Sequence, residues 1–515
     1  MKLEQVLEAV PVIGALPVAL LGTDVRGLAY DSRKVEPGFL FFAFSGAKTD
    51  GANYAAAAIE KGAIAIISDR PADSRARSPW IQVAHGREAL AMAARNFYRQ
   101  PDERVLLTGI TGTNGKTTSS LLLDAMLRAA GKITALIGTI EYHLAGRVLP
   151  AVNTTPESLD LFRMFDELAQ VGGTHATLEA SSHALDLRRI YAMHFHTAAF
   201  TNFTRDHLDY HGTMEEYFAA KESLFTPTSG PPPRFAVLNA DDEQVRRLKV
   251  AAETEVFWYG IDQMPPSTSG KHTCVHAGNI ESSFAGLRFE VVADAKRFSI
   301  ESALVGNINI YNILLASASA LTYGLSEEEI QKGLANLQRV PGRFERVEEG
   351  QPFTVVVDYA HTDDALRNVI TAARGMRPKR VITLFGCGGD RDRSKRPLMG
   401  VAAAEGSDYV ILTSDNPRSE DPLAIMNDAM VGLSRFDTPH TAEPDRERAI
   451  RKAIETAGPG DVVILAGKGH ETYQILRDGP IPFDDREVAR RVLRSFGYGK
   501  PVRKTAQTVD RPQSA

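Results

Sequence analysis

The stretch TGTNGKTT at residues 111–118 combines two closely spaced glycines with a lysine and a threonine. The apolar run before it, RVLLTGI at 104–110, predicts a buried strand. The segment after it, TTSSLLLDAMLRAA at 117–130, has helical apolar spacing and is followed by Gly131. Strand, glycine-rich loop and helix in this order favour a phosphate-binding loop, because loop N–H groups and the positive end of a helix both attract anions.

The loop departs from the strict phosphate-loop pattern at one position. That pattern has glycine six places before its lysine, whereas this chain has Ile110 before Lys116, and Gly109 lies one residue further out. Gly112 and Gly115 still allow backbone N–H groups to approach phosphate oxygens. A tight turn with an incidental Gly-Lys-Thr is the alternative.

Length and composition indicate a soluble protein with several cores. The chain has 515 residues, 43% of them apolar, and 64 acidic residues stand against 59 Lys and Arg, which favours neither nucleic acid nor a membrane surface as partner. The two cysteines, Cys274 and Cys387, lie far apart, as expected in a reducing compartment. The apolar run at 10–22 is interrupted by prolines and follows acidic residues, so we expect folded structure there and a cytoplasmic protein.

Apolar runs alternate with amphipathic segments from about residue 104, and the pattern restarts after 337, which predicts an α/β fold with two doubly wound units. Unusual polar residues follow the apolar runs, and ligands of such sheets bind beyond the carboxyl ends of the strands. The first hundred residues differ in pattern and predict a smaller domain. The predicted boundaries are 1–98, 99–338 and 339–499, followed by a disordered polar tail at 500–515.

Further motifs are spread along nearly the whole chain: DSRKVEPGFLFFAFSG (31–46), GITGTNGKTT (109–118), NTTPE (153–157), LEASSHAL (178–185), TNFTRDHLDYHG (201–212), YFAAKESLF (217–225), GNINIYN (306–312), VPGRFE (340–345), DYAHTDDAL (358–366), GCGGDRD (386–392), SDNPR (414–418) and GKGHE (467–471). Together they resemble the motifs of the Mur ligases, ATP-dependent enzymes that build the peptide of bacterial cell-wall precursors. The resemblance implies three domains: a small N-terminal α/β uridine-nucleotide domain, a central P-loop-type ATPase domain and a C-terminal Rossmann-like domain that binds the amino acid.

The resemblance also implies the chemistry. A carboxylate must become an electrophile before an amine can attack it, and ATP achieves this through an acyl phosphate. Because charge builds up on the transferring phosphoryl group, cations should surround it. The implied ATP-binding residues are Gly112, Thr113, Asn114, Gly115, Lys116, Thr117, Thr118, Asn309, Asn312, Arg343 and Asp358. The asparagines, Arg343 and Asp358 could instead be hinge or capping residues.

Four residues are implied as catalytic: Lys116, Glu179, His207 and Lys221. Thr117, Glu179, His207 and Lys221 are the implied magnesium ligands, with Lys221 converted by carbon dioxide into a carbamate anion. That reaction needs the neutral amine, so burial and neighbouring cations must lower the lysine pKa from about 10.4. The alternatives are an arginine-paired buried acid for Glu179, a surface or capping histidine for His207 and a solvated helix lysine for Lys221.

Two further groups match the family's binding regions for the uridine nucleotide and its peptide. The implied residues are Tyr30, Ser32, Ala47, Lys48 and Thr49 for the nucleotide, and Thr154, Thr155, Ser181 and Arg189 for the muramoyl dipeptide. Hydroxyl-rich turns often only cap the backbone, which is the alternative. Leu187 stands where some relatives have glutamine, which puts that one substrate contact in question.

The SDNPR motif predicts the incoming amino acid. Relatives that add meso-diaminopimelate carry this arginine, and a guanidinium can bind the second carboxylate of that amino acid through two parallel hydrogen bonds. The implied diaminopimelate-binding residues are Arg391, Asp415, Asn416, Pro417, Arg418, Gly467 and Glu471. Arg391 could instead pair with Asp390 or Asp392, and Glu471 could cap a helix.

The resemblance therefore implies ATP-dependent addition of meso-diaminopimelate to UDP-N-acetylmuramoyl-L-alanyl-D-glutamate, by an expected monomer that binds small molecules and no nucleic acid. A lysine-adding Mur ligase, a folylpolyglutamate synthetase-like ligase and a catalytically silent nucleotide-binding scaffold are the alternatives. The silent scaffold is disfavoured because Lys116, Glu179, His207 and Lys221 are all present.

Overall fold

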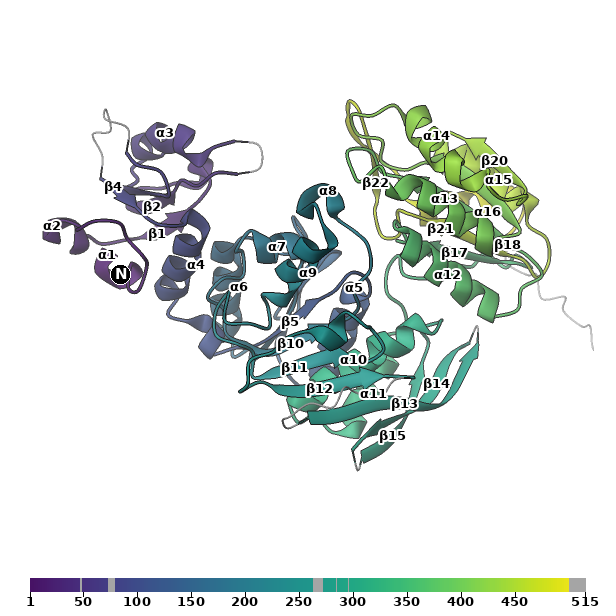
Figure 1. Cartoon of the computed structure of the whole chain (residues 1–515), viewed down its shortest axis with the longest axis horizontal. Helices are drawn as coiled ribbons and strands as arrows, with labels where there is room; N and C mark the ends of the chain where they lie inside the picture. Colours follow the sequence, from purple (N-terminus) through teal and green to yellow (C-terminus); the bar gives the residue numbers. More distant parts are fainter. Residues whose placement is uncertain (47–48, 73–78, 263–271, 284, 295, 500–515) are drawn as a thin grey trace, which may run out of the picture. The chain divides into compact units, whose positions relative to one another are not determined.

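The computed structural model describes residues 1–46, 49–72, 79–262, 272–283, 285–294 and 296–499 (Figure 1). Ala47, Lys48 and the tail at 500–515, for which predictions were made, lie outside the described residues. The chain forms two compact units, Met1–Val340 and Pro341–Ala515. None of the described helices is long and apolar enough to span a bilayer.

A small parallel sheet forms the start of the first unit, with the strand order β1-β2-β3-β4. Its strands are β1 (Gly27–Ala29), β2 (Phe39–Phe42), β3 (Ala65–Ser68) and β4 (Trp80–Gln82). The helices of this region are α1 (Leu3–Val6), α2 (Val18–Leu21), α3 (Ala55–Glu60) and α4 (Gly86–Phe97). One hydrophobic cluster runs from here into the rest of the unit and joins Leu90 to Phe162 and Phe165. The predicted boundary at residue 98 stays a prediction.

The large sheet of the first unit has the order β15-β14-β13-β12-β11-β10-β5-β9-β6-β7-β8. Neighbouring strands are parallel from β13 to β6 and antiparallel beyond both. The strands are β5 (Leu106–Thr111), β6 (Thr134–Ile137), β7 (Glu141–Leu144), β8 (Arg147–Pro150), β9 (His175–Glu179), β10 (Phe195–Phe200), β11 (Phe235–Asn239), β12 (Glu255–Gly260), β13 (His272–Ser283), β14 (Gly286–Ala293) and β15 (Lys296–Ser302). Because β5 lies between β9 and β10, the carboxyl ends of these three strands meet at one edge.

The predicted helix after the glycine-rich loop is α5 (Lys116–Ala129), which starts one residue earlier than expected. Gly115 precedes it and Gly131 follows it, both with positive φ. The buried face of α5 includes Leu122, Leu123 and Met126, which pack into a core with α10 and α11. The other helices of the unit are α6 (Ser158–Gln170), α7 (Ser182–Asp186), α8 (Leu208–His211), α9 (Met214–Glu222), α10 (Ile308–Thr322) and α11 (Glu327–Asn336).

The second unit is a doubly wound sheet, as predicted, with the order β16-β17-β21-β18-β19-β20 and only β16 antiparallel. Helices α12, α13 and α14 pack together, as do α15 and α16. The strands are β16 (Glu345–Val347), β17 (Thr354–Asp358), β18 (Val381–Cys387), β19 (Tyr409–Ser414), β20 (His440–Glu443) and β21 (Val462–Ala466), with a separate hairpin β22 (Tyr473–Leu476) and β23 (Gly479–Pro482). The helices are α12 (Asp363–Gly375), α13 (Lys395–Gly406), α14 (Pro422–Leu433), α15 (Arg446–Thr456) and α16 (Asp485–Ser495).

A fully buried ion pair fastens α15 and α16 to the carboxyl edge of this sheet. Arg446 donates to both carboxylate oxygens of Asp485, at 2.8 and 2.6 Å. The same guanidinium donates to the carbonyls of Ser414 and Ala466, the last residues of β19 and β21. Both charged side chains are completely buried, so each depends on the other for compensation.

We expect Asp485→Asn to lower the free energy of unfolding by about 3 kcal/mol, because it leaves the Arg446 charge buried without its counter-ion. Urea unfolding followed by circular dichroism measures the change. Glu487→Gln on the same helix is the matched control, since it removes an ion pair with Arg490 whose glutamate is exposed, and it should change stability by less than about 1 kcal/mol. Equal losses for the two variants would contradict this assignment.

Candidate functional site

The glycine-rich loop between β5 and α5 has the backbone shape that its sequence requires. Gly112 and Gly115 adopt φ of +133° and +89°, which side chains rarely allow. A Cβ atom on Gly115 would lie 2.4 Å from Oδ1 of Asn312, so a second element also crowds the loop. Ile110 is fully buried within β5. The position where the strict pattern has glycine therefore belongs to the strand here.

Two lysines converge on one carbonyl of this loop. Lys116 Nζ and Lys221 Nζ each donate to the carbonyl oxygen of Gly112 at 2.8 Å. Lys221 comes from α9, is almost completely buried and lies 4.5 Å from the centre of the Tyr217 ring. Burial, followed by the charge of Lys116, holds the pKa of the Lys221 amine well below its ordinary value. The interpretation of Lys221 as a solvated helix lysine is therefore wrong.

Glu179 ends β9 and lies directly across from the loop. Its Oε2 accepts hydrogen bonds from the hydroxyls of Thr117 and Thr139, at 3.1 and 2.9 Å, and its Oε1 accepts from the Thr139 N–H at 2.9 Å. No arginine pairs with this carboxylate in the described part of the chain, so the arginine-paired interpretation is wrong. The acid is held by hydroxyls and one amide, all of which can bind it without neutralising its charge.

His207 lies close enough to Lys221 and Lys116 to feel their charges, and it has a left-handed backbone conformation with φ of +54°. Its Nε2 is 3.4 Å from Oδ2 of Asp206, and its ring contacts that of His183 at 4.9 Å between centroids. Burial is the main cause that lowers the pKa of His207 to about 3, and Asp206 opposes it. The imidazole is therefore neutral at pH 7, the form that binds metals. The residue precedes α8 but its side chain caps nothing, so the capping interpretation is wrong.

The assignment of Thr117, Glu179, His207 and Lys221 as magnesium ligands stays a prediction. Among the described residues, no group of three or more His, Cys, Asp or Glu side chains converges on one metal position. Thr117 and Glu179 do supply adjacent oxygen atoms, which are the ligands that Mg²⁺ prefers.

The two asparagines of α10 support the phosphate loop from behind. Asn312 Nδ2 donates to Oδ1 of Asn309 at 2.9 Å, and Asn312 Oδ1 accepts from the hydroxyl of Ser119 on α5 at 3.3 Å. Asn309 in turn donates to the carbonyl of Val305. Both side chains are buried. A nucleotide contact by either asparagine stays a prediction.

The implied dipeptide-binding residues adjoin Glu179. Thr155 donates its hydroxyl to the Glu179 carbonyl at 2.7 Å, and Ser181 caps α7 by accepting from the backbone N–H of Ala184, so these hydroxyls do hold the backbone. Arg189 donates to the Thr155 carbonyl and to Glu157, a carboxylate that the sequence interpretation missed although it belongs to the NTTPE motif. Leu187, where some relatives have glutamine, is half-buried just after α7.

The implied nucleotide residues near the N-terminus have contacts of different kinds. Tyr30 donates to Oδ2 of Asp160 at 2.6 Å, and burial with this carboxylate raises the tyrosine pKa. Ser32 opens a short 3-10 helix, and the exposed Thr49 contacts only the Tyr54 hydroxyl among described side chains. Thr154 shares a 3.1 Å hydrogen bond with Thr139.

In the second unit, Asp358 is the last residue of β17, and Arg343 lies shortly before β16. Burial raises the pKa of Asp358, while Arg343 and the N–H groups of Phe344 and Ala360 oppose that shift. Both N–H groups donate to the carboxylate, at 2.7 and 2.8 Å. The Arg343 guanidinium lies 4.6 Å from the centre of the Tyr359 ring.

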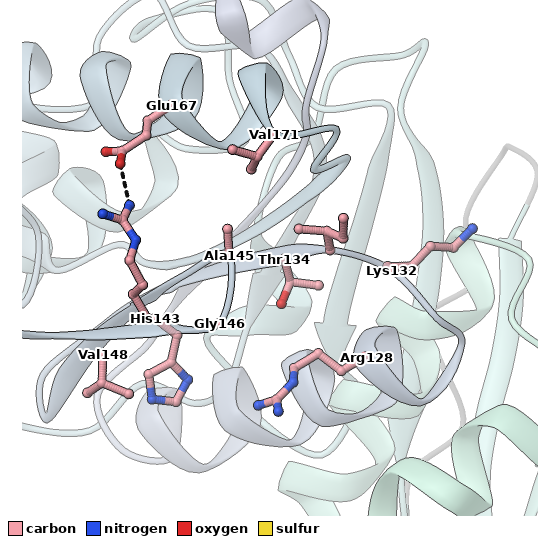
Figure 2. A pocket seen from close by; sticks show the side chains of 11 residues that line it. Arg128, Lys132, Thr134, His143, Ala145, Gly146, Val148, Glu167 and Val171 are labelled. Atoms are coloured by element: carbon pink, nitrogen blue, oxygen red, sulfur yellow. Dashed lines mark hydrogen bonds and ion pairs between the residues drawn. The ribbon is translucent and has the colours of Figure 1, made fainter.

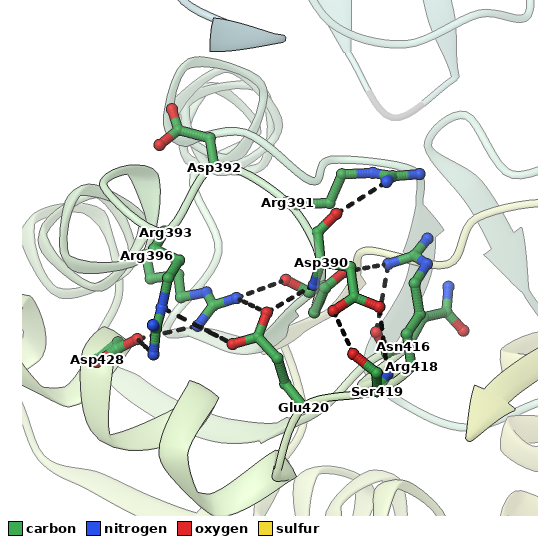
Figure 3. Close-up of polar contacts among 12 residues, drawn as sticks. Asp390, Arg391, Asp392, Arg393, Arg396, Asn416, Arg418, Ser419, Glu420 and Asp428 are labelled. Atoms are coloured by element: carbon green, nitrogen blue, oxygen red, sulfur yellow. Dashed lines mark hydrogen bonds and ion pairs between the residues drawn. The ribbon is translucent and has the colours of Figure 1, made fainter. Parts of the chain in front are cut away.

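Arg391 and Arg418 come from neighbouring loops and face the same region (Figure 3). Arg418 Nη1 donates to the carbonyls of Gly389 and Asn416, and Arg391 Nη1 donates to the carbonyl of Asp390. Neither guanidinium has a carboxylate partner among the described residues, so the pairing of Arg391 with Asp390 or Asp392 is wrong. Burial, and then the charge of Arg391, lowers the pKa of Arg418.

Asp415, Asn416 and Glu471 are tied together by Lys468, which the sequence interpretation missed. Lys468 is completely buried and its Nζ donates to Glu471 Oε2 at 2.9 Å and to Asn416 Oδ1 at 3.2 Å, with Asp415 Oδ1 3.9 Å away. Glu471 lies in a turn before β22, so it caps no helix. Gly467 has a φ of +115°, and a Cβ atom there would lie 2.5 Å from Asp415. The sequence did contain a signal for Lys468, because this lysine follows closely after an apolar run.

A cavity of ≈730 Å³ lies elsewhere on the first unit (Figure 2). Arg128 and Lys132, at the end of α5 opposite to the phosphate loop, line it together with Arg147, which is ion-paired to Glu167. None of the implied site residues lines this cavity. The cavity is therefore not part of the site around the glycine-rich loop.

We expect Gly115→Ala to weaken ATP binding by roughly tenfold or more, because the new methyl group both strains the backbone and displaces Asn312. Calorimetric titration with ATP measures the affinity. Gly131→Ala at the other end of α5 is the control, since that glycine also has a positive φ (+74°) but no atom within 4 Å of the place that a Cβ would take. It should lower stability by about 1 kcal/mol and leave ATP affinity unchanged; an equal loss of affinity there would contradict the role of the loop.

Known proteins resemble the chain over almost its whole length. The chain matches the Mur ligase middle domain over residues 110–320, the Mur ligase glutamate ligase domain over 342–469 and the Mur ligase family catalytic domain over 24–98. It is 63% identical to a UDP-N-acetylmuramoyl-L-alanyl-D-glutamate--2,6-diaminopimelate ligase from Solibacter usitatus (strain Ellin6076), across 97% of this chain and 99% of the relative.

Two solved structures extend the comparison to the fold. One is described as a UDP-N-acetylmuramoyl-L-alanyl-D-glutamate--2,6-diaminopimelate ligase, with 31% identity, a TM-score of 0.67 and coverage of 97% of this chain and 99% of that one. The other, a MurF ligase from Thermotoga maritima in complex with ADP, shares the fold at 18% identity and a TM-score of 0.62, with coverage of 92% and 99%. By its motifs, its sheets and its relatives, the chain belongs to the Mur ligase family.

Proposed function

We propose that the chain is an ATP-dependent ligase that joins meso-diaminopimelate to UDP-N-acetylmuramoyl-L-alanyl-D-glutamate in cell-wall precursor synthesis. The observation that carries the choice of amino acid is the pair of guanidinium groups on Arg391 and Arg418. Within the described residues, both use only Nη1 for bonds to the protein, and those bonds go to backbone carbonyls. Two neighbouring guanidinium groups that form no ion pair with any described carboxylate favour a ligand that brings carboxylates.

The phosphate loop supplies the first half of the reaction. The side-chain carboxylate of the glutamate in the substrate attacks the terminal phosphorus of ATP; the bond to the ADP oxygen breaks and an acyl phosphate forms. Lys116, together with the N–H groups of the loop, holds the phosphate oxygens as their charge increases. Thr117 and Glu179 have oxygen atoms that could act as ligands of Mg²⁺, and the ion would neutralise charge on the phosphate.

The second half takes place when the amine of diaminopimelate attacks the acyl carbon. The carbon–oxygen bond to phosphate breaks, inorganic phosphate leaves and the amine loses a proton. Lys468, Asn416 and Glu471 form a polar cluster suited to the amino and carboxylate groups of the amino acid. Arg418 would bind the far carboxylate, which lysine lacks.

Lys221 has the environment that carbamate formation requires. Burial and the charge of Lys116 lower the pKa of this amine and favour its neutral form, which can attack carbon dioxide, releasing a proton and leaving an anion. The anion would remove the repulsion between this lysine and Lys116 and provide a further oxygen ligand for magnesium, with neutral His207 as another ligand. Arg343, Asp358 and the α10 asparagines are proposed for the nucleotide, and Tyr30, Ser32, Thr49, Thr154, Thr155, Ser181 and Arg189 for the uridine-linked substrate.

The alternatives have less support. A folylpolyglutamate synthetase-like ligase does not account for the unpaired arginines or for the identity with the diaminopimelate-adding relative. A lysine-adding ligase would place an ammonium group beside Arg391 and Arg418. A cytoplasmic location and a monomeric state stay predictions.

We expect phosphate release that depends on the UDP-linked dipeptide and on meso-diaminopimelate, with kcat/KM at least about a thousandfold lower for L-lysine. A coupled phosphate assay with each amino acid measures this. Turnover with lysine that equals or exceeds turnover with diaminopimelate would overturn the specificity. Arg418→Ala should raise KM for diaminopimelate while it leaves the KM for ATP within about twofold of the original.

We expect Lys221→Ala to lose at least about 99% of the ligase activity, and short carboxylic acids such as formate or acetate to restore part of it, because they supply the missing anion. Intact mass under bicarbonate should show a carbon dioxide adduct on the original protein, which Lys221→Ala lacks. Failure of rescue together with an unmodified Lys221 would contradict the carbamate. Lys332→Ala, on the exposed face of α11, is the control for non-specific stimulation by the acids.

A further inference from the structure

Two loops carry the unpaired arginines, and each contains a residue in a backbone conformation that side chains disfavour. Asp390 in the β18–α13 loop and Arg418 in the β19–α14 loop both have φ of +52°. Such conformations persist only where surrounding contacts hold them. The like charges of Arg391 and Arg418 also repel, so something must hold the two loops close together.

A set of hydrogen bonds around Asp390 joins the loops (Figure 3). Its carboxylate accepts from the Ser419 hydroxyl at 2.6 Å and from the Ser419 N–H at 3.2 Å. Its own N–H donates to Oε1 of Glu420 at 2.6 Å. We refer to Asp390, Ser419 and Glu420 as the clasp. Each of its members is next to, or within two residues of, Arg391 or Arg418.

A buried arginine anchors the clasp from behind. Arg396, the second residue of α13, is completely buried and donates to both carboxylate oxygens of Glu420, at 3.0 and 2.8 Å. It also donates to Asp428 at 2.9 Å and to the carbonyl of Gly388 at 3.3 Å. Glu420 is therefore the link between Arg396 and the backbone of Asp390, whereas Asp428 contacts the same guanidinium without touching the clasp.

We propose that Arg396, acting through Glu420, is a positioning residue for amino-acid recognition: it fixes the clasp and thereby the spacing of the Arg391 and Arg418 guanidinium groups. The ligand rests on the proposed function, whereas the clasp itself does not. The charge-assisted bonds of Arg396 orient the Glu420 carboxylate, and this carboxylate orients the N–H of Asp390. The arrangement resembles an outer shell that orients the groups in contact with a ligand.

The test compares Glu420→Gln with Asp428→Asn, since each removes one negative charge from Arg396 but only the first weakens the bond to Asp390. We expect Glu420→Gln to raise KM for diaminopimelate roughly tenfold and to change KM for ATP less than about twofold. Asp428→Asn should leave both values within about twofold. Ser419→Ala, which removes the exposed hydroxyl from Asp390 without touching Arg396, should raise KM for diaminopimelate about threefold and covers the case in which Glu420→Gln does not fold.

Amide hydrogen exchange tests the clasp without any ligand. Exchange at Asp390 and Ser419 should be at least about tenfold faster in Glu420→Gln and unchanged in Asp428→Asn. Faster exchange with an unchanged KM for diaminopimelate would overturn the positioning role, and so would equal effects of the two variants. If the original protein does not use diaminopimelate, the proposed function fails, and the exchange rates alone then decide whether the clasp holds the loops.

Discussion

The carbonyl oxygen of Gly112 accepts hydrogen bonds from two lysines, and the site in the first unit depends on this shared acceptor. Two charged ammonium groups at such a short distance would repel each other strongly in a buried environment. Burial is the largest cause that lowers the pKa of Lys221. Negative charge at this place would therefore relieve the repulsion between the two lysines. A triphosphate or a carbamate changes that balance, because either supplies negative charge at the same place. The lysine side chains at the loop therefore favour the binding of anions, as its backbone N–H groups do.

Sheet register explains why so few elements are needed to build each site. Ile110 of β5 pairs with Glu179 of β9, so Glu179 lies beside the point where the chain leaves β5 for the phosphate loop. In the second unit Asp358 pairs with Ala466, and Cys387 with Ser414, which brings the starts of four loops to one edge. Parallel strands that end together present their following loops together. The Arg446–Asp485 pair holds two of these strand ends to the helices behind them.

The sequence predicts most of this arrangement where the signal is local. The glycines around Lys116 and the polar residues after apolar runs predicted the loops and the edges at which they lie. Contacts between distant residues were not predictable in that way: Thr139 reaches Glu179 from the connection between β6 and β7, and Arg396 meets Glu420 through a tertiary contact. The change of pattern near residue 100 predicted a smaller separate domain, but it did not reveal the hydrophobic cluster shared with the rest of the first unit.

Each unit brings two cationic side chains close together, and the repulsion between them is limited in different ways. In the first, burial and the charge of Lys116 lower the pKa of Lys221, which favours the neutral form of that amine. In the second, arginine cannot lose its proton at physiological pH, so Arg391 and Arg418 must keep their charges and be held by the protein. Their bonds to backbone carbonyls orient them without neutralising them. In the proposed function a carboxylate of the ligand would supply negative charge there, whereas the ammonium of lysine would add a third cation. The proposed selectivity for a diacid thus rests on two guanidinium groups that form no ion pair with any described carboxylate.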